Sequence, residues 1–321
     1  MRLASFEHLE PRTVAEACAL LAEHGETSAV MAGGTDLLVR MKHGVTTPQR
    51  LINIKRVEGL GEMRRAGKGL SIGAAATLTE IRKSAIVREE YPILAEAALG
   101  VGAAQLQNMG TLGGNLCLEP RCWYYQQTPS WRAARPSCFK NGGAVCYMAK
   151  GAKRCYALYC GDTAAALLAL GASVRLETSQ GERTVALEEF FVDDGRHHTV
   201  RRPDELLSAV LLPPSAPGQK GTYLKYRKRG TVDFPIVGVG AVMRPETEVR
   251  VAVTGAGSAP FLVAGVAEVA TGGKLTAEGI DEIATAAGKQ AKPVSHMEVS
   301  TAYRKQLVRV LTRDALEKLG S

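Results

Sequence analysis

The chain has 321 residues, 45% of them hydrophobic and 22% charged, which is typical of a globular protein with two or three domains. The N-terminus lacks the apolar run of a signal peptide, and no stretch offers roughly 18 uncharged apolar residues. We therefore expect a cytoplasmic protein without a membrane span. The net charge of +8 comes with only 5% aromatic residues. This combination favours a solvated or partner-facing basic surface over a nucleic-acid site. The basic residues are densest at residues 225–229.

Short helices and strands alternate in the first two thirds of the chain. Capping-box patterns at residues 13–16 and 77–80 begin two of the helices. Helices are predicted at residues 13–24, 77–84 and 93–101, strands at 28–31, 51–54, 70–74, 172–176 and 203–212, and a helix or a buried strand at 164–170.

The last third of the chain forms a separate unit after the proline-rich segment 213–218, which is the best candidate linker. This unit is predicted to contain strands at residues 222–229, 237–243 and 249–254 and helices at residues 276–289 and 301–319. A strand meander followed by helices that pack on it predicts an α+β domain.

Two glycine-rich loops are candidate phosphate sites. Residues 32–38 read Ala-Gly-Gly-Thr-Asp-Leu-Leu, and residues 110–115 read Gly-Thr-Leu-Gly-Gly-Asn. Consecutive N–H groups in such turns form a nest that binds anions, and two nests in one domain favour a bound pyrophosphate. Neither loop matches G-x-G-x-x-G, so a Rossmann fold has little support.

A cysteine-rich segment follows the second glycine loop. Its spacing is Cys122-x15-Cys138-x7-Cys146-x8-Cys155, with Cys117 and Cys160 just outside it. In a reducing compartment, clustered cysteines favour metal binding or chemistry over disulfides. This spacing is neither a C-x2-C zinc knuckle nor a ferredoxin run. It leaves zinc, an iron–sulfur cluster and a set of buried thiols all open, as well as the choice of ligands.

The two glycine loops resemble the FAD pyrophosphate loops of the medium subunit of molybdenum hydroxylases. This family includes carbon monoxide dehydrogenase and the flavin domain of xanthine dehydrogenase. Phe190 and residues 204–207, 225–229 and 300–304 also fall where the family carries its later motifs. Gln107 departs from the pattern, because many relatives have arginine there, and its contribution near the flavin is an open question.

The resemblance implies an α+β fold with a two-part FAD-binding domain and a C-terminal domain. The implied units are residues 1–55, residues 56–216 with an iron–sulfur insertion at about 119–158, and residues 217–321. Ordinary members of the family lack the insertion, so excising it would join Cys117 almost directly to Cys160. These two cysteines then belong to the part of the chain that all family members share, here called the frame. The other four cysteines lie in the insertion. Such an insertion resembles that of a branch of the family whose medium subunit carries an extra [4Fe–4S] cluster.

The site residues implied by the resemblance bind cofactors, and none is catalytic. The implied FAD residues are Val30, Met31, Ala32, Gly33, Gly34, Thr35, Asp36, Leu37, Val101, Thr111, Leu112, Gly113, Gly114, Asn115, Asp162, Leu207 and Lys225. The implied [4Fe–4S] ligands are Cys122, Cys138, Cys146 and Cys155.

The resemblance also implies partners and a direction of electron flow. The partners would be a large molybdenum cofactor subunit and a small subunit with two [2Fe–2S] clusters, in an (αβγ)2 heterohexamer. Reduced ferredoxin would donate electrons to the [4Fe–4S] cluster, which would pass them through FAD to the [2Fe–2S] centres. They would serve the reductive dehydroxylation of an aromatic coenzyme A thioester in anaerobic aromatic degradation. The alternative is a flavin subunit of another hydroxylase, with a zinc-bound structural cysteine loop.

Overall fold

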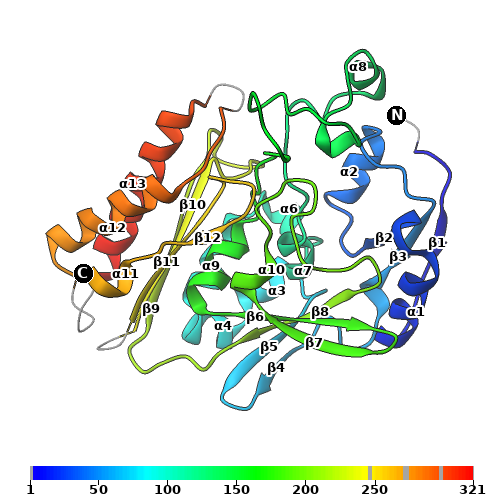
Figure 1. The fold of residues 1–321 in the computed structure, drawn as a ribbon. Coiled ribbons are helices and arrows are strands. Elements are labelled where there is room, and N and C mark those ends of the chain that lie inside the picture. Colours follow the sequence, from blue (N-terminus) through cyan, green and yellow to red (C-terminus); the bar gives the residue numbers. More distant parts are fainter. Residues whose placement is uncertain (1–2, 245–247, 270–274, 296–298, 321) are drawn as a thin grey trace.

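The computed structural model describes residues 3–244, 248–269, 275–295 and 299–320 and contains three separate sheets (Figure 1). The first is a small parallel sheet with strand order β1-β3-β2. Its elements are β1 (Glu7–Leu9), α1 (Val14–His24), η1 (Gly25–Thr27), β2 (Ser28–Met31), α2 (Leu37–Lys42), β3 (Arg50–Asn53) and η2 (Ile54–Arg56). The Thr13 hydroxyl accepts a hydrogen bond from the Glu16 N–H and so caps α1, as its sequence predicts.

The second sheet is antiparallel, with strand order β4-β5-β8-β6-β7. Its strands are β4 (Met63–Ala66), β5 (Gly69–Gly73), β6 (Ser173–Thr178), β7 (Gly181–Ala186) and β8 (Leu206–Leu212). The helices of this unit are α3 (Leu78–Lys83), α4 (Ala85–Glu90), α5 (Pro92–Gly100), α6 (Ala104–Gln107), α7 (Leu112–Leu116), α9 (Asp162–Leu170) and α10 (Leu187–Phe190). The largest apolar core lies between these helices and the sheet.

The third sheet is an antiparallel meander with order β12-β11-β10-β9. Its elements are β9 (Lys220–Tyr226), β10 (Val237–Arg244), β11 (Glu248–Thr254), β12 (Phe261–Leu262), α11 (Val266–Val269), α12 (Ala277–Gln290) and α13 (Thr301–Gly320). In Figure 1, α12 and α13 cover its outer face, while α9 contacts β10 and β11 from the side of the second unit. The α+β class predicted from the sequence is confirmed.

Helix α9 settles whether residues 164–170 form a helix or a strand. All nine of its residues are buried, because the apolar core of the second unit and the third sheet both pack against the helix. The left-handed conformation of Gly171, at φ 75°, ends the helix. The helix starts at Asp162, so the frame that surrounds the insertion continues directly into the most buried element of the second unit.

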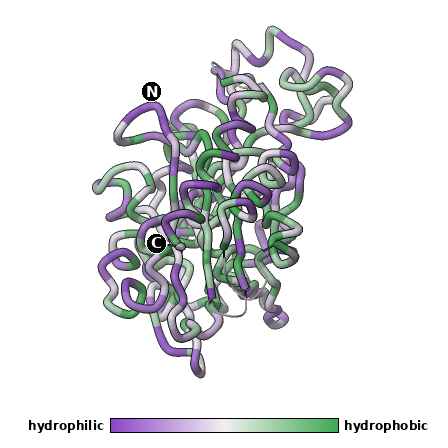
Figure 2. Tube along the Cα trace, turned by 90° about the vertical axis from the view of Figure 1, so that its left-hand side faces the viewer, coloured by the Kyte–Doolittle hydropathy of each residue, from purple (hydrophilic) through white to green (hydrophobic). Residues whose placement is uncertain are grey.

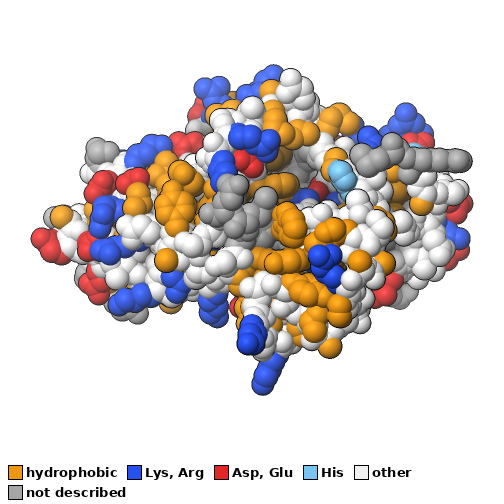
Figure 3. All heavy atoms as spheres, turned by 90° about the horizontal axis from the view of Figure 1, so that it is seen from above, with side chains coloured by type: hydrophobic (Ala, Val, Ile, Leu, Met, Phe, Trp, Pro, Cys, Tyr) orange, Lys and Arg blue, Asp and Glu red, His pale blue; other side chains and the backbone are white. Residues whose placement is uncertain are grey.

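The insertion stands out from the body at the top of the molecule (Figures 1 and 2). It contains α8 (Pro129–Ala133) and η3 (Phe139–Asn141). Its base is closed by two backbone hydrogen bonds between Arg121 and Leu158, at 2.7 and 2.9 Å. Seen from above, hydrophobic side chains and Lys and Arg side chains are intermixed over its surface (Figure 3). No helix in the described ranges is long and apolar enough to cross a membrane.

Candidate flavin site and cysteine pocket

A cavity of about 890 Å³ is lined by segments of all three units, and its volume is typical of a cofactor site. The predicted residues that line it are Val30, Met31, Ala32, Gly33, Gly34, Thr35, Asp36, Leu37, Val101, Thr111, Gly113, Gly114, Asn115, Asp162 and Leu207. Leu112 is instead fully buried in the main core. Lys225 lies behind the wall, where it pairs with Asp162.

The first glycine loop packs closely against the residues just before the second loop. A Cβ at Gly33 would lie 1.8 Å from the Met109 carbonyl oxygen, so only glycine permits this close approach. Gly34 has a left-handed φ of 68°. Within the described part of the chain, the N–H groups of Gly33, Gly34 and Thr35 have no hydrogen-bond partner. Three adjacent free donors on a cavity wall fit the oxygens of a pyrophosphate.

The second glycine loop differs from the nest that the sequence suggests, because it forms the short helix α7. The Thr111 hydroxyl caps this helix by accepting from the Gly114 N–H at 3.2 Å. The Leu112 and Gly113 N–H groups donate to carbonyl oxygens of residues 74–76, at 3.0 and 2.9 Å. These amides are therefore already paired, and the loop contributes a close backbone wall rather than a second row of free donors.

Asn115 joins the two ends of the frame around the insertion. Its Oδ1 accepts hydrogen bonds from the backbone N–H and the hydroxyl of Thr163, at 3.0 and 2.7 Å. The Tyr159 hydroxyl donates to the carbonyl oxygens of Asn115 and Leu116, at 3.1 and 2.9 Å. These contacts hold the second glycine loop against α9 with the insertion between them in sequence.

Asp162 presents a buried carboxylate to the cavity, with its side chain only 3% exposed. It lies 2.9 Å from the Lys225 ammonium, and the Tyr223 hydroxyl donates to it at 2.9 Å. Burial raises the pKa of Asp162, and the Lys225 charge opposes this rise. Lys225 also donates to the carbonyl oxygens of Gly100 and Asp233, both at 2.9 Å. The solvated surface expected for the run 225–229 is therefore wrong for its first residue, which is a buried structural cation.

Gln107 has a structural role beside the cavity. Its Nε2 donates to the carbonyl oxygens of Leu99 and Val101, both at 2.9 Å, and the residue is buried. These bonds hold the end of α5, and the cavity residue Val101 that follows it, against α6.

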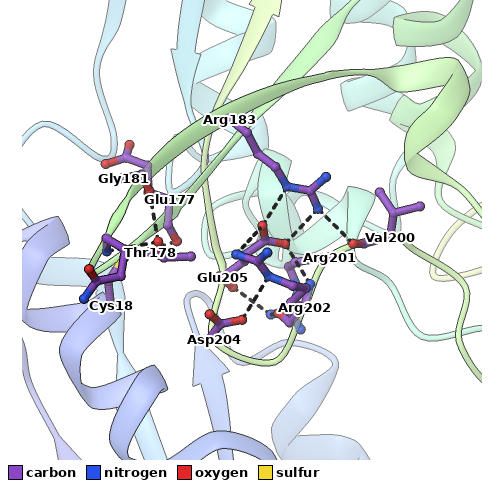
Figure 4. A network of polar contacts seen from close by, with 11 residues as sticks. Cys18, Glu177, Thr178, Gly181, Arg183, Val200, Arg201, Arg202, Asp204 and Glu205 are labelled. Atoms are coloured by element: carbon purple, nitrogen blue, oxygen red, sulfur yellow. Dashed lines mark hydrogen bonds and ion pairs between the residues drawn. The ribbon is translucent and has the colours of Figure 1, made fainter.

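A buried carboxylate network positions the strand that carries Leu207 into the cavity (Figure 4). Glu205 is 1% exposed and accepts from the Arg183 Nε and Nη2, at 2.7 and 3.0 Å, and from the Arg202 N–H at 2.7 Å. Burial raises the pKa of Glu205, but the hydrogen bonds and charges of Arg183 and Arg202 outweigh it and lower the pKa below its ordinary value. The network fixes the turn before β8.

One wall of the cavity is not predicted by the sequence. It comes from residues 196–199 with Arg201, and these include two adjacent histidines, His197 and His198. The segment has no glycine pattern or metal-ligand spacing, so nothing in it signals a binding site. It reaches the cavity because β7, α10 and the turn before β8 fold it back over the second glycine loop.

Comparisons with known proteins agree with this geometry. The model of the FAD-binding domain in molybdopterin dehydrogenase matches residues 4–215, and that of the carbon monoxide dehydrogenase flavoprotein C-terminal domain matches residues 222–319. The chain is an FAD-binding medium subunit of the molybdenum hydroxylase family. The two-part FAD-binding fold with a C-terminal domain is thereby confirmed.

Individual relatives cover most of this medium subunit. The aldehyde oxidoreductase FAD-binding subunit PaoB of Escherichia coli is 34% identical over 279 residues, which are 81% of this chain and 84% of that protein. The carbon monoxide dehydrogenase medium chain of Hydrogenophaga pseudoflava is 27% identical over 315 residues, covering 97% and 96%. A solved structure of the Hydrogenophaga pseudoflava enzyme superimposes with a TM-score of 0.82 at 26% identity, covering 99% and 98%.

The four cysteines of the insertion line one small pocket of this medium subunit. Cys122 and Cys155 are buried, Cys138 and Cys146 are half-buried, and all four are free. Burial raises the pKa of the Cys122 thiol to about 11. Across the described residues, no three His, Cys, Asp or Glu side chains form a group that could hold a metal ion.

The two frame cysteines lie elsewhere. Cys117 lines the FAD cavity, and Cys160 is buried in the main core. The structure therefore places the four insertion cysteines together and Cys117 and Cys160 elsewhere. This is the division that the comparison with family members lacking the insertion predicts. The apolar contacts of the cysteine pocket come from side chains of the insertion itself, namely Tyr124, Tyr125, Phe139, Met148 and Ala157.

A buried ion pair links the cysteine pocket to the FAD cavity. Lys140 lines the cysteine pocket with its side chain 3% exposed, and Glu119 lines the FAD cavity. The Lys140 ammonium pairs with the Glu119 carboxylate and donates to the Gly195 carbonyl oxygen. Burial raises the pKa of Glu119, but Lys140 and neighbouring charges lower it below its ordinary value.

Two arginines anchor the insertion to the first glycine loop and the residues after it. Arg121 pairs with Asp36, and its guanidinium lies 4.7 Å from the centre of the Phe234 ring. Arg132 donates to the Gly44 carbonyl oxygen at 2.7 Å. The insertion is therefore fastened to the FAD-binding unit at its base and at α8.

Proposed function

We propose that this chain is the β subunit of 4-hydroxybenzoyl-CoA reductase, an oxidoreductase subunit that carries FAD and a [4Fe–4S] cluster. In this role it passes electrons from reduced ferredoxin, through the cluster and FAD, to the [2Fe–2S] and molybdenum centres of partner subunits for reductive dehydroxylation. The observation that carries the proposal is the single pocket lined by Cys122, Cys138, Cys146 and Cys155 inside an insertion beside the FAD cavity. When bound, FAD supplies the redox chemistry, and the chain's residues bind and orient it.

The number of cysteines in the pocket suits a cluster. A [4Fe–4S] cluster takes one cysteine per iron, and the pocket supplies Cys122, Cys138, Cys146 and Cys155. One zinc ion also takes four thiolates, at about 2.3 Å from the ion. We prefer the cluster because the insertion resembles that of the family branch whose medium subunit carries an extra [4Fe–4S] cluster.

The position of the insertion supports electron transfer to the flavin. It is closed at its base by Arg121 and Leu158, both within a few residues of the FAD cavity wall. The Glu119–Lys140 pair spans the remaining separation, because one partner lines each pocket. A redox group in the cysteine pocket therefore lies next to the flavin site.

The charge of the insertion supports an acidic electron donor such as ferredoxin. Residues 119–158 contain seven Lys and Arg residues and one acidic residue, out of a net charge of +8 for the whole chain. Arg135, Lys150, Lys153 and Trp123 are exposed. A concentrated positive field of this kind attracts an acidic protein and orients it on approach.

The proposed assembly is an (αβγ)2 heterohexamer in the cytoplasm, with a large molybdenum cofactor subunit and a small subunit that holds two [2Fe–2S] clusters. Two relatives are named as an FAD-binding subunit and a medium chain, which supports a multi-subunit enzyme. The aromatic thioester would bind to the large subunit, because no residue of this chain is proposed to contact it.

The test removes the insertion and keeps its base. Residues 122–157 are replaced by a short turn between Arg121 and Leu158, which already pair with each other. The variant is assembled with its partner subunits, and the rate of flavin reduction by reduced ferredoxin is measured. We expect FAD to be retained, reduction by ferredoxin to be lost, and reduction by a small chemical reductant to persist.

The chemical reductant is the control, because it shows that the flavin of the variant is still accessible and active. Flavin reduction by ferredoxin at the wild-type rate would contradict the proposal. It would leave the insertion with a structural role and favour the zinc alternative.

A further inference from the structure

A buried cation forms part of the wall of the cysteine pocket. Of the described residues that line this pocket, Lys140 alone carries a charge, and its side chain is only 3% exposed. Lysine is almost never buried to this extent unless its charge is paired. The pocket therefore contains a fixed positive charge as well as four thiols.

Gly195 places the Lys140 ammonium next to one of the cysteines. The ammonium donates to the Gly195 carbonyl oxygen, and the Gly195 N–H donates to the Cys155 carbonyl oxygen at 3.0 Å. A Cβ at Gly195 would lie 2.9 Å from the Cys155 sulfur, so the Gly195 backbone packs directly against that thiol. Burial raises the pKa of the Cys155 thiol, and the Ala157 N–H and the Lys140 charge oppose this rise. The positive charge is therefore separated from a cysteine sulfur by a single glycine.

The counter-charge of Lys140 lies on the side of the FAD cavity. The Glu119 carboxylate pairs with the Lys140 ammonium, but Glu119 lines the FAD cavity, whereas Lys140 lines the cysteine pocket. The Glu119 side chain is 25% exposed, so water screens its charge more than it screens the buried ammonium. The ion pair thus leaves a net positive field on the cysteine side.

We propose that Lys140 raises the reduction potential of the cluster held in the cysteine pocket and that Glu119 limits this rise. The inference rests on the proposed [4Fe–4S] cluster. Four thiolate ligands give such a centre a net negative charge, which grows by one when it accepts an electron from the donor. A fixed positive charge in a poorly solvated pocket stabilises the reduced form more than the oxidised form. The ion pair thereby favours entry of the electron and reduces the driving force of its next step to the flavin.

The experiment measures the midpoint potential of the cluster in the anaerobically purified full-length chain, by redox titration at pH 7 followed by electron paramagnetic resonance. Lys140→Met removes the positive charge and should shift the potential to a more negative value. Glu119→Gln removes the counter-charge and should shift it to a less negative value. Opposite shifts are expected for a charge effect, whereas mere loosening of the insertion gives no reason for them. Lys140→Arg keeps the charge, and Lys150→Met removes an exposed charge of the same insertion, so both should stay close to wild type.

The iron content of each protein is measured first, because it separates the inference from the proposed function. Wild-type chain without iron would overturn both. Iron in every variant, with shifts of Lys140→Met and Glu119→Gln that are absent or in the same direction, would overturn the inference and leave the cluster standing. If Lys140→Met loses its iron, Glu119→Gln decides alone, and a potential equal to wild type or more negative would overturn the inference.

Discussion

Lys140→Met should destabilise the insertion while leaving its apolar contacts in place. The Lys140 side chain is 3% exposed, and its partner Glu119 is 25% exposed. Removing one member of a buried ion pair costs about 3–5 kcal/mol, because the other charge is left unpaired. Glu119 keeps some contact with water and lies near Arg40, so we expect a smaller cost than this range, about 2–3 kcal/mol.

The chain provides its own probe for this prediction, because both of its tryptophans, Trp123 and Trp131, lie in the insertion. Urea unfolding followed by tryptophan fluorescence therefore reports on the insertion. With a urea slope of about 2 kcal/mol per M, the midpoint for Lys140→Met should fall by roughly 1 M. Lys150→Met removes an exposed lysine of the same insertion and should leave the midpoint unchanged.

The double variant Glu119→Gln/Lys140→Met separates charge from packing. Glutamine removes the unpaired carboxylate, so the double variant should regain at least half of the lost stability. A midpoint for Lys140→Met equal to wild type, or a double variant no more stable than the single one, would refute the claim that this ion pair fastens the insertion.

Three further experiments test the cofactor sites and the Glu205 network. Gly114→Val should fold but lose FAD, because Gly114 lines the cavity and the added side chain would occupy cofactor space; normal flavin content in the purified protein would contradict this. Cys138→Ala should lose iron while Cys117→Ala keeps it, and equal iron loss would show that the frame and insertion cysteines are not separate sets. The pKa of Glu205 is lowered by Arg183, so its contribution to stability is complete above about pH 4.5 and is lost as the pH falls further. Glu205→Gln should therefore flatten the acid side of the stability curve, and an unchanged slope in urea titrations from pH 5 to roughly pH 3 would argue against the network.

The sequence was sufficient for features that depend on residue type. The close backbone approach at Gly33 and the left-handed φ of Gly34 both require glycine. Such positions can therefore be recognised from the residue type alone. The four cysteines of the insertion could be separated from Cys117 and Cys160 by comparing chain lengths within the family, and the structure places the two sets apart.

Features that arise from tertiary contacts could not be predicted in the same way. The amides of the second loop are paired because residues 74–76 pack against it. Lys225 reads as part of a basic surface run, yet the fold buries it against Asp162. His198 reaches the cavity and Lys140 reaches Glu119 only through the way distant segments fold together. Such residues are ordinary polar residues in the sequence, with no spacing that marks them.

The most direct test of the account is the cofactor content of the anaerobically purified chain. FAD, iron, acid-labile sulfide and zinc are measured per chain, together with the visible absorption and the electron paramagnetic resonance spectrum of the reduced protein. The account predicts one FAD and about four iron and four sulfide per chain, with negligible zinc. About one zinc per chain without iron or sulfide would contradict it.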